Sequence, residues 1–229
     1  MNDFDGDGYA RAAMVLTQPQ CEHIAGALPT LAAAGRGGIR HLISHPVVGK
    51  LLLLQQLSGS LWSAVGRDLV AVNATLFDKT PAANWRVQWH QDRTIAVKDR
   101  LDVRGYGPWS TKNGTAHVDA PDAVLAQMVA VRIHLDHSGA ENGPLRVIPG
   151  THTLGKLSER EIAAAVAGGP VAELTVTQGS VIFMRPLLVH SSSAAASPAH
   201  RRVLHIEFAP RECISPLEWH TAVALKRAA

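Results

Sequence analysis

From residue 69 to residue 208, short apolar segments alternate with turn-forming residues. The segments are rich in valine, isoleucine, leucine and phenylalanine, and they span residues 69–77, 86–90, 128–135, 145–148, 171–176, 180–184 and 202–208. Glycine, proline, aspartate and asparagine separate them. Because short strands with this punctuation are typical of sandwiches and barrels rather than of parallel βαβ units, we predict a mainly β fold. The expected architecture is a jelly-roll core with α-helices packed on one outer face.

Outside these segments, the pattern predicts one strand and three helices that flank or interrupt the core. The strand covers residues 9–16, and one helix lies within residues 45–65. The other two helices begin after Thr17 and after Ser158, because threonine and serine are favoured N-cap residues. Glu161, three residues after Ser158, completes a capping-box pattern. These two helix starts therefore have local signals of their own.

The length of 229 residues and the apolar fraction of 46% fit one large domain with a sizeable core. We divide this single domain, residues 1–229, into an N-terminal flank of helices and a strand (1–67), a β core (68–210) and a C-terminal segment (211–229). Residues 93–126 form a long, charged insertion within the core, punctuated by glycine and proline. Loops of this length in compact domains are usually functional or disordered, and we predict a lid over the substrate.

Composition and charge exclude several classes of partner. The formal net charge is +3 and lysine and arginine form no block, which argues against nucleic acid. The longest apolar run, residues 51–54, is far shorter than the roughly 20 residues that cross a bilayer. The start of the chain is acidic where a secretory signal is basic, and two cysteines cannot form a disulfide framework. We therefore expect a cytoplasmic protein without a membrane partner.

Among the twelve histidines, His90 and His190 are candidate metal ligands together with Asp92. Because side chains alternate along a strand, His90 and Asp92 point to the same side of their segment. His190 lies just beyond the later apolar segment 180–184, and a jelly-roll core brings early and late strands together. Two histidines and one carboxylate on one face of an octahedron are the ligand set of non-haem Fe(II) oxygenases.

Two other hypotheses are compatible with the same three ligands. One is a cupin-like metalloprotein that uses zinc or manganese for hydrolysis or isomerisation, and the other is a catalytically silent binding module. Arg201 and Arg202 favour an oxygenase, because a guanidinium group forms a bidentate pair with the far carboxylate of a dicarboxylate cosubstrate. With Fe(II), Asp92 and the dicarboxylate, one arginine makes the buried cluster neutral. Strand alternation alone places Arg202 in the apolar row, so both arginines remain candidates.

Four motifs carry a resemblance to a known family. They are residues 90–92, the stretch 141–152 with its Asn-Gly-Pro-Leu and Pro-Gly-Thr-His sequences, residues 186–190 and Arg201. In this combination, roughly residues 5–210 resemble the phytanoyl-CoA dioxygenase family of Fe(II)/2-oxoglutarate-dependent oxygenases. The stretch 141–152 is the most family-specific part.

The resemblance implies a double-stranded β-helix in which His90, Asp92 and His190 bind Fe(II). It also implies that Arg201, eleven residues after the distal histidine, binds 2-oxoglutarate, with Arg202 as the alternative. Further contacts to 2-oxoglutarate fall at Ser192, Thr75 and Lys79. The implied reaction uses O2 to hydroxylate an unactivated C–H bond of a small molecule, while 2-oxoglutarate is decarboxylated to succinate and CO2. Halogenation is disfavoured, since related halogenases lack the carboxylate that Asp92 provides.

Two groups of residues are candidates for substrate contact. Arg132 and His134 share one face of their segment, where better-known family members carry a tryptophan, and they are candidates to bind an anionic group of substrate or cosubstrate. The second group lies in the insertion and consists of Arg104, Tyr106 and Trp109. No residue requires the substrate to be an acyl-CoA, and the sequence does not determine the oligomeric state.

Overall fold

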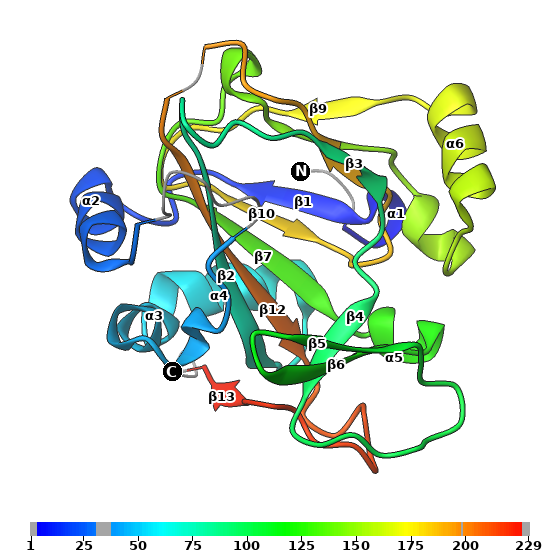
Figure 1. Ribbon diagram of the computed structural model, residues 1–229. Helices are drawn as coiled ribbons and strands as arrows, with labels where there is room; N and C mark the ends of the chain where they lie inside the picture. Colours follow the sequence, from blue (N-terminus) through cyan, green and yellow to red (C-terminus); the bar gives the residue numbers. More distant parts are fainter. Residues whose placement is uncertain (1–3, 31–37, 198, 226–229) are drawn as a thin grey trace.

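Two antiparallel β-sheets face one another in the computed structural model, which describes residues 4–30, 38–197 and 199–225 (Figure 1). The larger sheet has the strand order β1 (Tyr9–Ala12), β10 (Val181–Met184), β7 (Val129–His134), β12 (Arg201–Ala209), β2 (Val70–Lys79) and β13 (Val223–Ala224). The smaller sheet has the order β3 (Val87–His90), β11 (His190–Ser192), β8 (Leu145–Val147) and β9 (Ala172–Leu174). Apolar side chains from both sheets pack together between them. This double-stranded β-helix confirms the predicted fold class.

Helices flank the two sheets (Figure 1). They are α1 (Phe4–Asp7), α2 (Gln18–Ala27), α3 (Pro46–Leu52), α4 (Gln55–Val65), α5 (Asp122–Leu125) and α6 (Glu159–Gly168), with short 3-10 helices at Leu42–Ser44, Ala140–Asn142 and Thr151–Leu154. The predicted helix starts are confirmed, because Thr17 and Ser158 form capping boxes at the beginning of α2 and α6. The single helix expected within 45–65 is instead two helices, since the backbone becomes extended at Leu54. The break lets α3 and α4 each bury an apolar side.

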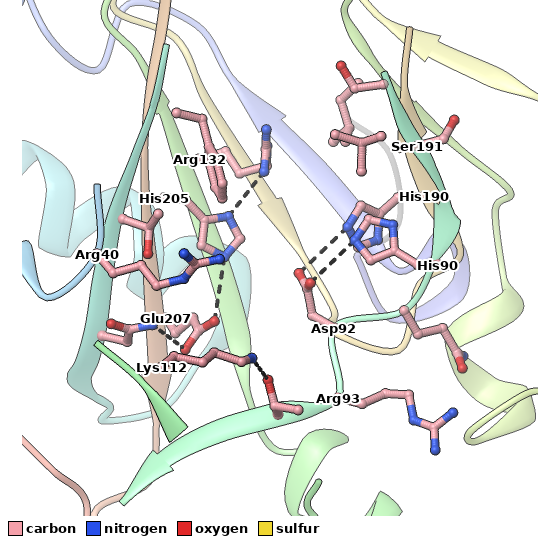
Figure 2. A pocket seen from close by; sticks show the side chains of 18 of the residues that line it. Arg40, His90, Asp92, Arg93, Lys112, Arg132, His190, Ser191, His205 and Glu207 are labelled. Atoms are coloured by element: carbon pink, nitrogen blue, oxygen red, sulfur yellow. Dashed lines mark hydrogen bonds and ion pairs between the residues drawn. The ribbon is translucent and has the colours of Figure 1, made fainter. Parts of the chain in front are cut away.

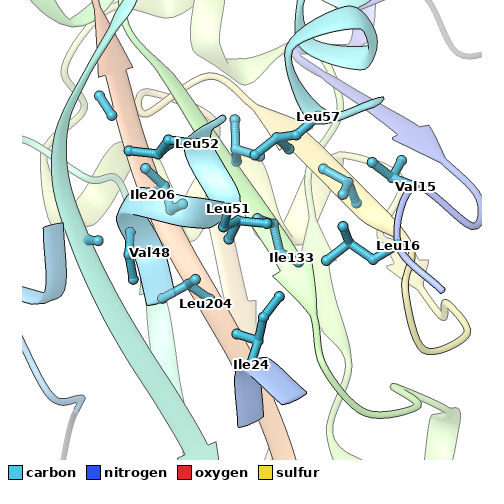
Figure 3. Close-up of a cluster of buried hydrophobic side chains, with 14 of the residues drawn as sticks. Val15, Leu16, Ile24, Val48, Leu51, Leu52, Leu57, Ile133, Leu204 and Ile206 are labelled. Atoms are coloured by element: carbon cyan, nitrogen blue, oxygen red, sulfur yellow. The ribbon is translucent and has the colours of Figure 1, made fainter. Parts of the chain in front are cut away.

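The main hydrophobic core lies between the larger sheet and α2, α3 and α4. Leu204 and Ile206 of β12 and Ile133 of β7 point toward this helical layer, where Leu51 and Leu52 of α3 meet them (Figure 3). The apolar row of β12 therefore faces the helices. Because neighbouring side chains of a strand point to opposite faces, the alternate row of β12 faces the interior between the two sheets. That alternate row consists of Arg201, Val203, His205 and Glu207.

Replacement of Leu51 by alanine tests this core. The Leu51 side chain is only 2% exposed, so the substitution leaves a cavity and should lower the free energy of unfolding by about 2–5 kcal/mol. Leu53, two residues later, is 57% exposed, and its replacement by alanine should change stability by less than about 0.5 kcal/mol. Urea denaturation of both variants measures the difference. Equal losses would contradict the placement of α3 on the sheet.

The insertion 93–126, expected as a lid loop, contains a third antiparallel sheet, with the order β4 (Thr94–Val97), β6 (Thr115–Asp119) and β5 (Trp109–Lys112). A tight hairpin joins β5 to β6, and both of its turn residues, Asn113 and Gly114, have positive φ angles of 48° and 78°. Asparagine followed by glycine suits such a turn, because these residues tolerate the left-handed backbone conformation. The insertion therefore has a regular structure of its own, and its role as a lid stays a prediction.

The described residues include neither a membrane-spanning helix nor a disulfide. In the described ranges, no helix combines the length and the apolar character needed to cross a membrane. Cys21 and Cys213 are both free thiols. The described part of the fold is therefore held by packing and hydrogen bonds without a disulfide.

Candidate active site

The predicted metal ligands come together on two neighbouring strands of the smaller sheet. His90 ends β3, His190 begins β11, and the two residues are direct partners in the antiparallel ladder. Asp92 follows β3, and its backbone N–H donates a hydrogen bond to the carbonyl of Pro186 (2.9 Å). This bond ties Asp92 to the turn that leads into β11. Both imidazoles and the carboxylate consequently point into the same space (Figure 2).

The distances among the three ligands suit a bound divalent ion. The Nε2 atoms of His90 and His190 each lie 3.6 Å from a carboxylate oxygen of Asp92, which is too long for a hydrogen bond. Ligand atoms about 2.1 Å from one ion and at right angles are about 3 Å apart, so small side-chain movements would admit the ion. The Nδ1 atoms lie 2.8 Å from the carbonyl oxygens of Gln88 and Leu188. Donation from Nδ1 to these carbonyls leaves Nε2 as the ligand atom.

The charges of the three residues also favour a cation. Burial, together with the neighbouring His90, lowers the pKa of His190 to about 3, so His190 is neutral. Burial acts to raise the pKa of Asp92, but the two histidines outweigh it and hold that pKa well below its usual range. Neutral imidazole and ionised carboxylate are the forms that bind metals. Asp92 and His190 are therefore in their metal-binding forms at neutral pH. Burial acts to lower the pKa of His90, but Asp92 outweighs it and raises that pKa, so a metal ion would compete with a proton at His90.

Gln91, between the first two ligands, fixes their segment to the surrounding loops. Its side-chain amide donates hydrogen bonds to the carbonyls of Gly155 (2.8 Å) and Leu187 (2.7 Å), and its oxygen accepts one from the N–H of Leu157 (2.8 Å). The residue is only 6% exposed. We infer that Gln91 holds the ligand segment in place, a role that the sequence analysis did not assign.

Lys79 and Arg201 lie side by side at the pocket wall, because they are direct partners in the β2–β12 ladder. Lys79 is fully buried, and its ammonium donates to the Ser192 hydroxyl (2.7 Å) and to the carbonyl of Ser193. Arg201 is 3% exposed and donates to the carbonyl of Gly143. We call Lys79, Arg201 and Ser192 the basic end of the pocket. Two buried cations without a carboxylate at hydrogen-bonding distance in the described residues create a site for an anion.

The Asn-Gly-Pro motif of the sequence is part of this basic end. Gly143 has a positive φ of 67°, and a Cβ atom there would collide with the carbonyl oxygen of Ser193. Its own carbonyl also accepts a hydrogen bond from the Ser192 hydroxyl (2.9 Å). Glycine is therefore required for the loop to approach the strand closely enough to meet Arg201.

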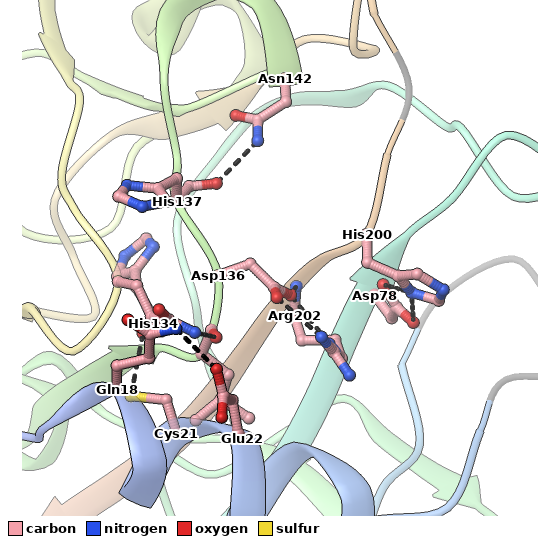
Figure 4. A network of polar contacts seen from close by, with 12 residues as sticks. Gln18, Cys21, Glu22, Asp78, His134, Asp136, His137, Asn142, His200 and Arg202 are labelled. Atoms are coloured by element: carbon pink, nitrogen blue, oxygen red, sulfur yellow. Dashed lines mark hydrogen bonds and ion pairs between the residues drawn. The ribbon is translucent and has the colours of Figure 1, made fainter.

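Arg202, the alternative anchor, lies on the opposite face of β12. Its guanidinium forms a bidentate pair with the carboxylate of Asp136, with donor–acceptor distances of 2.8 and 2.7 Å (Figure 4). Arg202 is therefore already neutralised by the protein, whereas Arg201 faces the pocket.

If 2-oxoglutarate binds at the basic end, as the resemblance implies, Lys79 should make that binding pH-dependent. Burial, together with the nearby charges of Arg201 and Arg132, lowers the pKa of Lys79 to about 7. A bound dianion would raise this pKa, so binding takes up a proton, and affinity should fall by up to about tenfold per pH unit above pH 7. Below pH 7 the lysine is already charged and this dependence ends. Calorimetric titration of the metal-loaded enzyme from pH 6 to 9 measures it.

Lys79→Met is the control for this titration. The variant should bind 2-oxoglutarate more weakly but without the decline above pH 7 that the lysine causes. The same slope in Lys79→Met and in the unchanged protein would show that another group titrates.

A pocket of about 610 Å³ lies between the two sheets and contains the metal ligands and the basic end. The hairpin of the insertion supplies Lys112, His117 and Asp119 to its wall, and the interior face of the larger sheet supplies Thr75, Asn73, Arg132, His205 and Glu207. The sequence analysis missed most of these residues. The Asn-Gly turn signal could have placed the hairpin, and the polar residues that alternate with apolar ones on β12 could have indicated His205 and Glu207.

One of the five predicted substrate residues lines the pocket, and the other four lie outside its described lining. Arg132 lines the pocket. His134 is buried on the same face of β7, but it lies outside the pocket lining, and its ring nitrogens have no hydrogen-bond partner in the described structure. Trp109 and Tyr106 pack against the apolar cluster beneath the third sheet, and Arg104 is exposed. These three residues of the insertion are likewise outside the described lining of the pocket.

Comparison with protein families gives one match over most of the chain. The family described as "Phytanoyl-CoA dioxygenase (PhyH)" matches residues 4–203. A curated relative, "L-proline trans-4-hydroxylase" of Streptomyces griseoviridis, is 30% identical over 146 residues, which is 52% of this chain and 47% of the relative. The matched stretch thus spans about half of the length of that relative.

Solved structures share the fold along nearly the whole chain. EctD from S. alaskensis in its apoform has a TM-score of 0.68 at 17% identity, with 99% of this chain and 85% of that chain covered. HygX from Streptomyces hygroscopicus, with nickel and 2-oxoglutarate bound, has a TM-score of 0.64 at 18% identity, with 90% and 84% covered. At these identities the likeness establishes the fold.

Proposed function

Because this chain belongs to the phytanoyl-CoA dioxygenase family, we propose that it is an Fe(II)/2-oxoglutarate-dependent oxygenase that hydroxylates a C–H bond of a small molecule. One observation carries the proposal. The His90–Asp92–His190 cluster opens into the same pocket as the buried cations Lys79 and Arg201. A metal site beside a site for a carboxylate is the arrangement that a chelating dicarboxylate requires.

The donor set fits Fe(II). Two imidazole nitrogens and one carboxylate leave further coordination positions open, and they are the ligand types of non-haem iron oxygenases. When bound, Fe(II) together with 2-oxoglutarate supplies the oxidising chemistry that cleaves a C–H bond. His90, Asp92 and His190 would hold the ion, and the bonds from Nδ1 to backbone carbonyls would keep both imidazoles in the orientation that ligation needs.

The basic end would hold the far carboxylate of 2-oxoglutarate. Arg201 offers a planar pair of donors and Lys79 a point charge, while Ser192 adds a hydroxyl group. Arg201 then balances the one negative charge that iron, Asp92 and the dianion leave together, and a protonated Lys79 adds one positive charge to this cluster. This pairing also orients the keto acid toward the metal.

The balanced reaction takes four electrons from two organic molecules. The C–H bond of the substrate and the decarboxylation of 2-oxoglutarate each give two electrons to O2. One oxygen atom enters the new hydroxyl group and the other enters succinate, while CO2 leaves. The sheet β4–β6–β5 borders the pocket, and we propose that it covers the substrate and keeps bulk water away. The relative that is named as a proline hydroxylase supports a small substrate.

Anaerobic addition of Fe(II) and then 2-oxoglutarate tests the proposal. We expect a visible metal-to-ligand charge-transfer band, because the keto acid chelates the iron. Succinate, which has two carboxylates but no keto group, is the control and should give no band. A succinate-release screen over amino acids, acyl thioesters and natural-product scaffolds would then identify the substrate class.

Two results would reject the oxygenase. Hydrolysis or isomerisation with zinc or manganese that does not require 2-oxoglutarate would favour the cupin-like alternative. If the protein binds neither Fe(II) nor 2-oxoglutarate, a catalytically silent binding module would be favoured.

A further inference from the structure

The interior face of the larger sheet presents three polar rows to the pocket. The register of β2, β12 and β7 places Lys79 beside Arg201, then Thr75, His205 and Arg132 in one row, and finally Asn73 beside Glu207. We call the second of these the arginine row and the third the acidic row. His205 is four positions after Arg201 on β12, a distance of about 13 Å along the strand. The arginine row is therefore distinct from the basic end.

Arg132 is a buried cation that forms no ion pair with a described carboxylate, although the charge of Asp92 acts on it from beyond ion-pairing distance. It is 7% exposed, and its one hydrogen-bond partner in the described structure is Nδ1 of His205, 3.1 Å from Nη1. Its Nε has no partner in the described ranges, and its guanidinium carbon lies 5.8 Å from the centre of the Phe77 ring. A buried guanidinium normally pairs with a carboxylate, because desolvation of an unpaired charge is costly. No described carboxylate lies within ion-pairing distance of Arg132.

The charged residues that line the pocket also favour the binding of an anion. Six lysines and arginines line its described wall, against three carboxylates. Asp119 is already paired with Arg93 (2.9 Å), and Asp92 faces the metal site. Fe(II) and the 2-oxoglutarate dianion cancel each other. A surplus of positive charge therefore remains in the part of the pocket left for the substrate, where it would attract an anion.

Glu207, in the acidic row, is a negatively charged group two residues after His205 on β12. One of its oxygens accepts a hydrogen bond from the amide of Asn73 (3.3 Å), and the other is 3.8 Å from Nε2 of His205. The second distance is too long for a hydrogen bond, so Glu207 can accept another donor. Arg132, His205 and Glu207 thus form a line across the pocket wall. Arg132 is at one end, and Glu207, with Lys112 and Arg40 beside it, is at the other (Figure 2).

We propose that the substrate is a small carboxylic acid whose carboxylate pairs with Arg132 and whose ammonium or hydroxyl group donates to Glu207. This inference rests on the proposed function. The far carboxylate of 2-oxoglutarate is assigned to the basic end and its other carboxylate to the metal. Arg132 is consequently left for the anionic group of the substrate.

Matched ligand pairs test the inference by binding. The Fe(II)–2-oxoglutarate complex is titrated anaerobically with the protein amino acids, with aliphatic and aromatic carboxylic acids, and with the primary amide of each. Binding is followed as a change in the charge-transfer band and by calorimetry. We expect at least one acid to bind while its amide, which lacks the charge, binds roughly 30-fold or more weakly.

Arg132→Met separates the roles of the two anions. The variant should form the charge-transfer band with an unchanged 2-oxoglutarate requirement, yet lose roughly 30-fold or more in affinity for the acid. Arg132→Lys keeps the charge and should retain part of that affinity, and Glu207→Gln should weaken acids that carry a donor group more than those that do not.

Three results would overturn the inference. The first is that acids and their amides bind equally well, and the second is that no acid of the panel binds. The third is that Arg132→Met loses the charge-transfer band to the same extent as an Arg201 variant. The last result would assign Arg132 to 2-oxoglutarate. If the unchanged protein forms no band with Fe(II) and 2-oxoglutarate, the proposed function itself fails, so the two failures are distinguishable.

Discussion

Replacement of His190 by alanine is expected to abolish formation of the Fe(II)–2-oxoglutarate complex. His190 is 4% exposed and neutral, and it contributes one of three ligand atoms that lie within 4.8 Å of one another. Loss of groups that merely support metal ligands lowers affinity by 10–100-fold, so loss of a ligand should cost about 100-fold or more. Anaerobic titration with Fe(II), read by calorimetry and by the charge-transfer band, measures the effect.

His23→Ala is the matched control for this variant. His23 is exposed on α2, away from the pocket, and its replacement should leave iron binding unchanged. Circular dichroism and thermal unfolding of both variants separate a loss of ligand from a loss of fold. Iron affinity that survives in a folded His190→Ala protein would show that the cluster is not the metal site.

Replacement of Arg201 by glutamine should have the second largest effect, with the loss confined to 2-oxoglutarate. Among the described residues, the Gly143 carbonyl and the Ser192 hydroxyl accept hydrogen bonds from this guanidinium at the basic end. Removing one partner of a buried charge pair costs about 2–5 kcal/mol, so the 2-oxoglutarate concentration for half-saturation should rise roughly 30-fold or more. Iron affinity should stay within about threefold, because Arg201 does not touch the ligands.

Arg202→Gln is the internal control, since the two arginines are neighbours on opposite faces of β12. Arg202 pairs with Asp136 outside the pocket, so its replacement should lower stability modestly and leave 2-oxoglutarate binding unchanged. An equal loss of 2-oxoglutarate affinity in Arg202→Gln would reverse the assignment. Titration of both variants with 2-oxoglutarate at fixed Fe(II) gives the comparison directly.

Some elements could be predicted because the residues that determine them lie close together in the sequence. Thr17 and Ser158 satisfy the first backbone donors of α2 and α6 from within a single helical turn, so the sequence alone indicates where these helices begin. The alternation that puts His90 and Asp92 on one side is equally local. The hairpin of the insertion also had a local signal, the Asn113–Gly114 pair, which the length and charge of the surrounding segment obscured.

The choice between the two arginines could not be made from β12 by itself. Alternation divides the strand into an apolar row and a polar row, but it does not say which row faces the interior. The helices α2, α3 and α4 cover the outer face and bury Leu204 and Ile206, which turns Arg201 inward. The pairing of Arg202 with Asp136 follows from the same orientation. Only the layer that packs against the strand therefore distinguishes neighbouring residues of identical type.

The strand-rich fold, two helix starts and the residue types that could bind a metal were predictable from the sequence, because all of these depend on spacing along the chain. Which distant residues meet became visible only in the folded chain. The tertiary structure placed His190 opposite His90, brought Lys79 beside Arg201, and left Arg132 buried without an ion pair to a described carboxylate. These arrangements depend on strand pairing and on the burial of one sheet face, and both are set by contacts between segments that are distant in the chain.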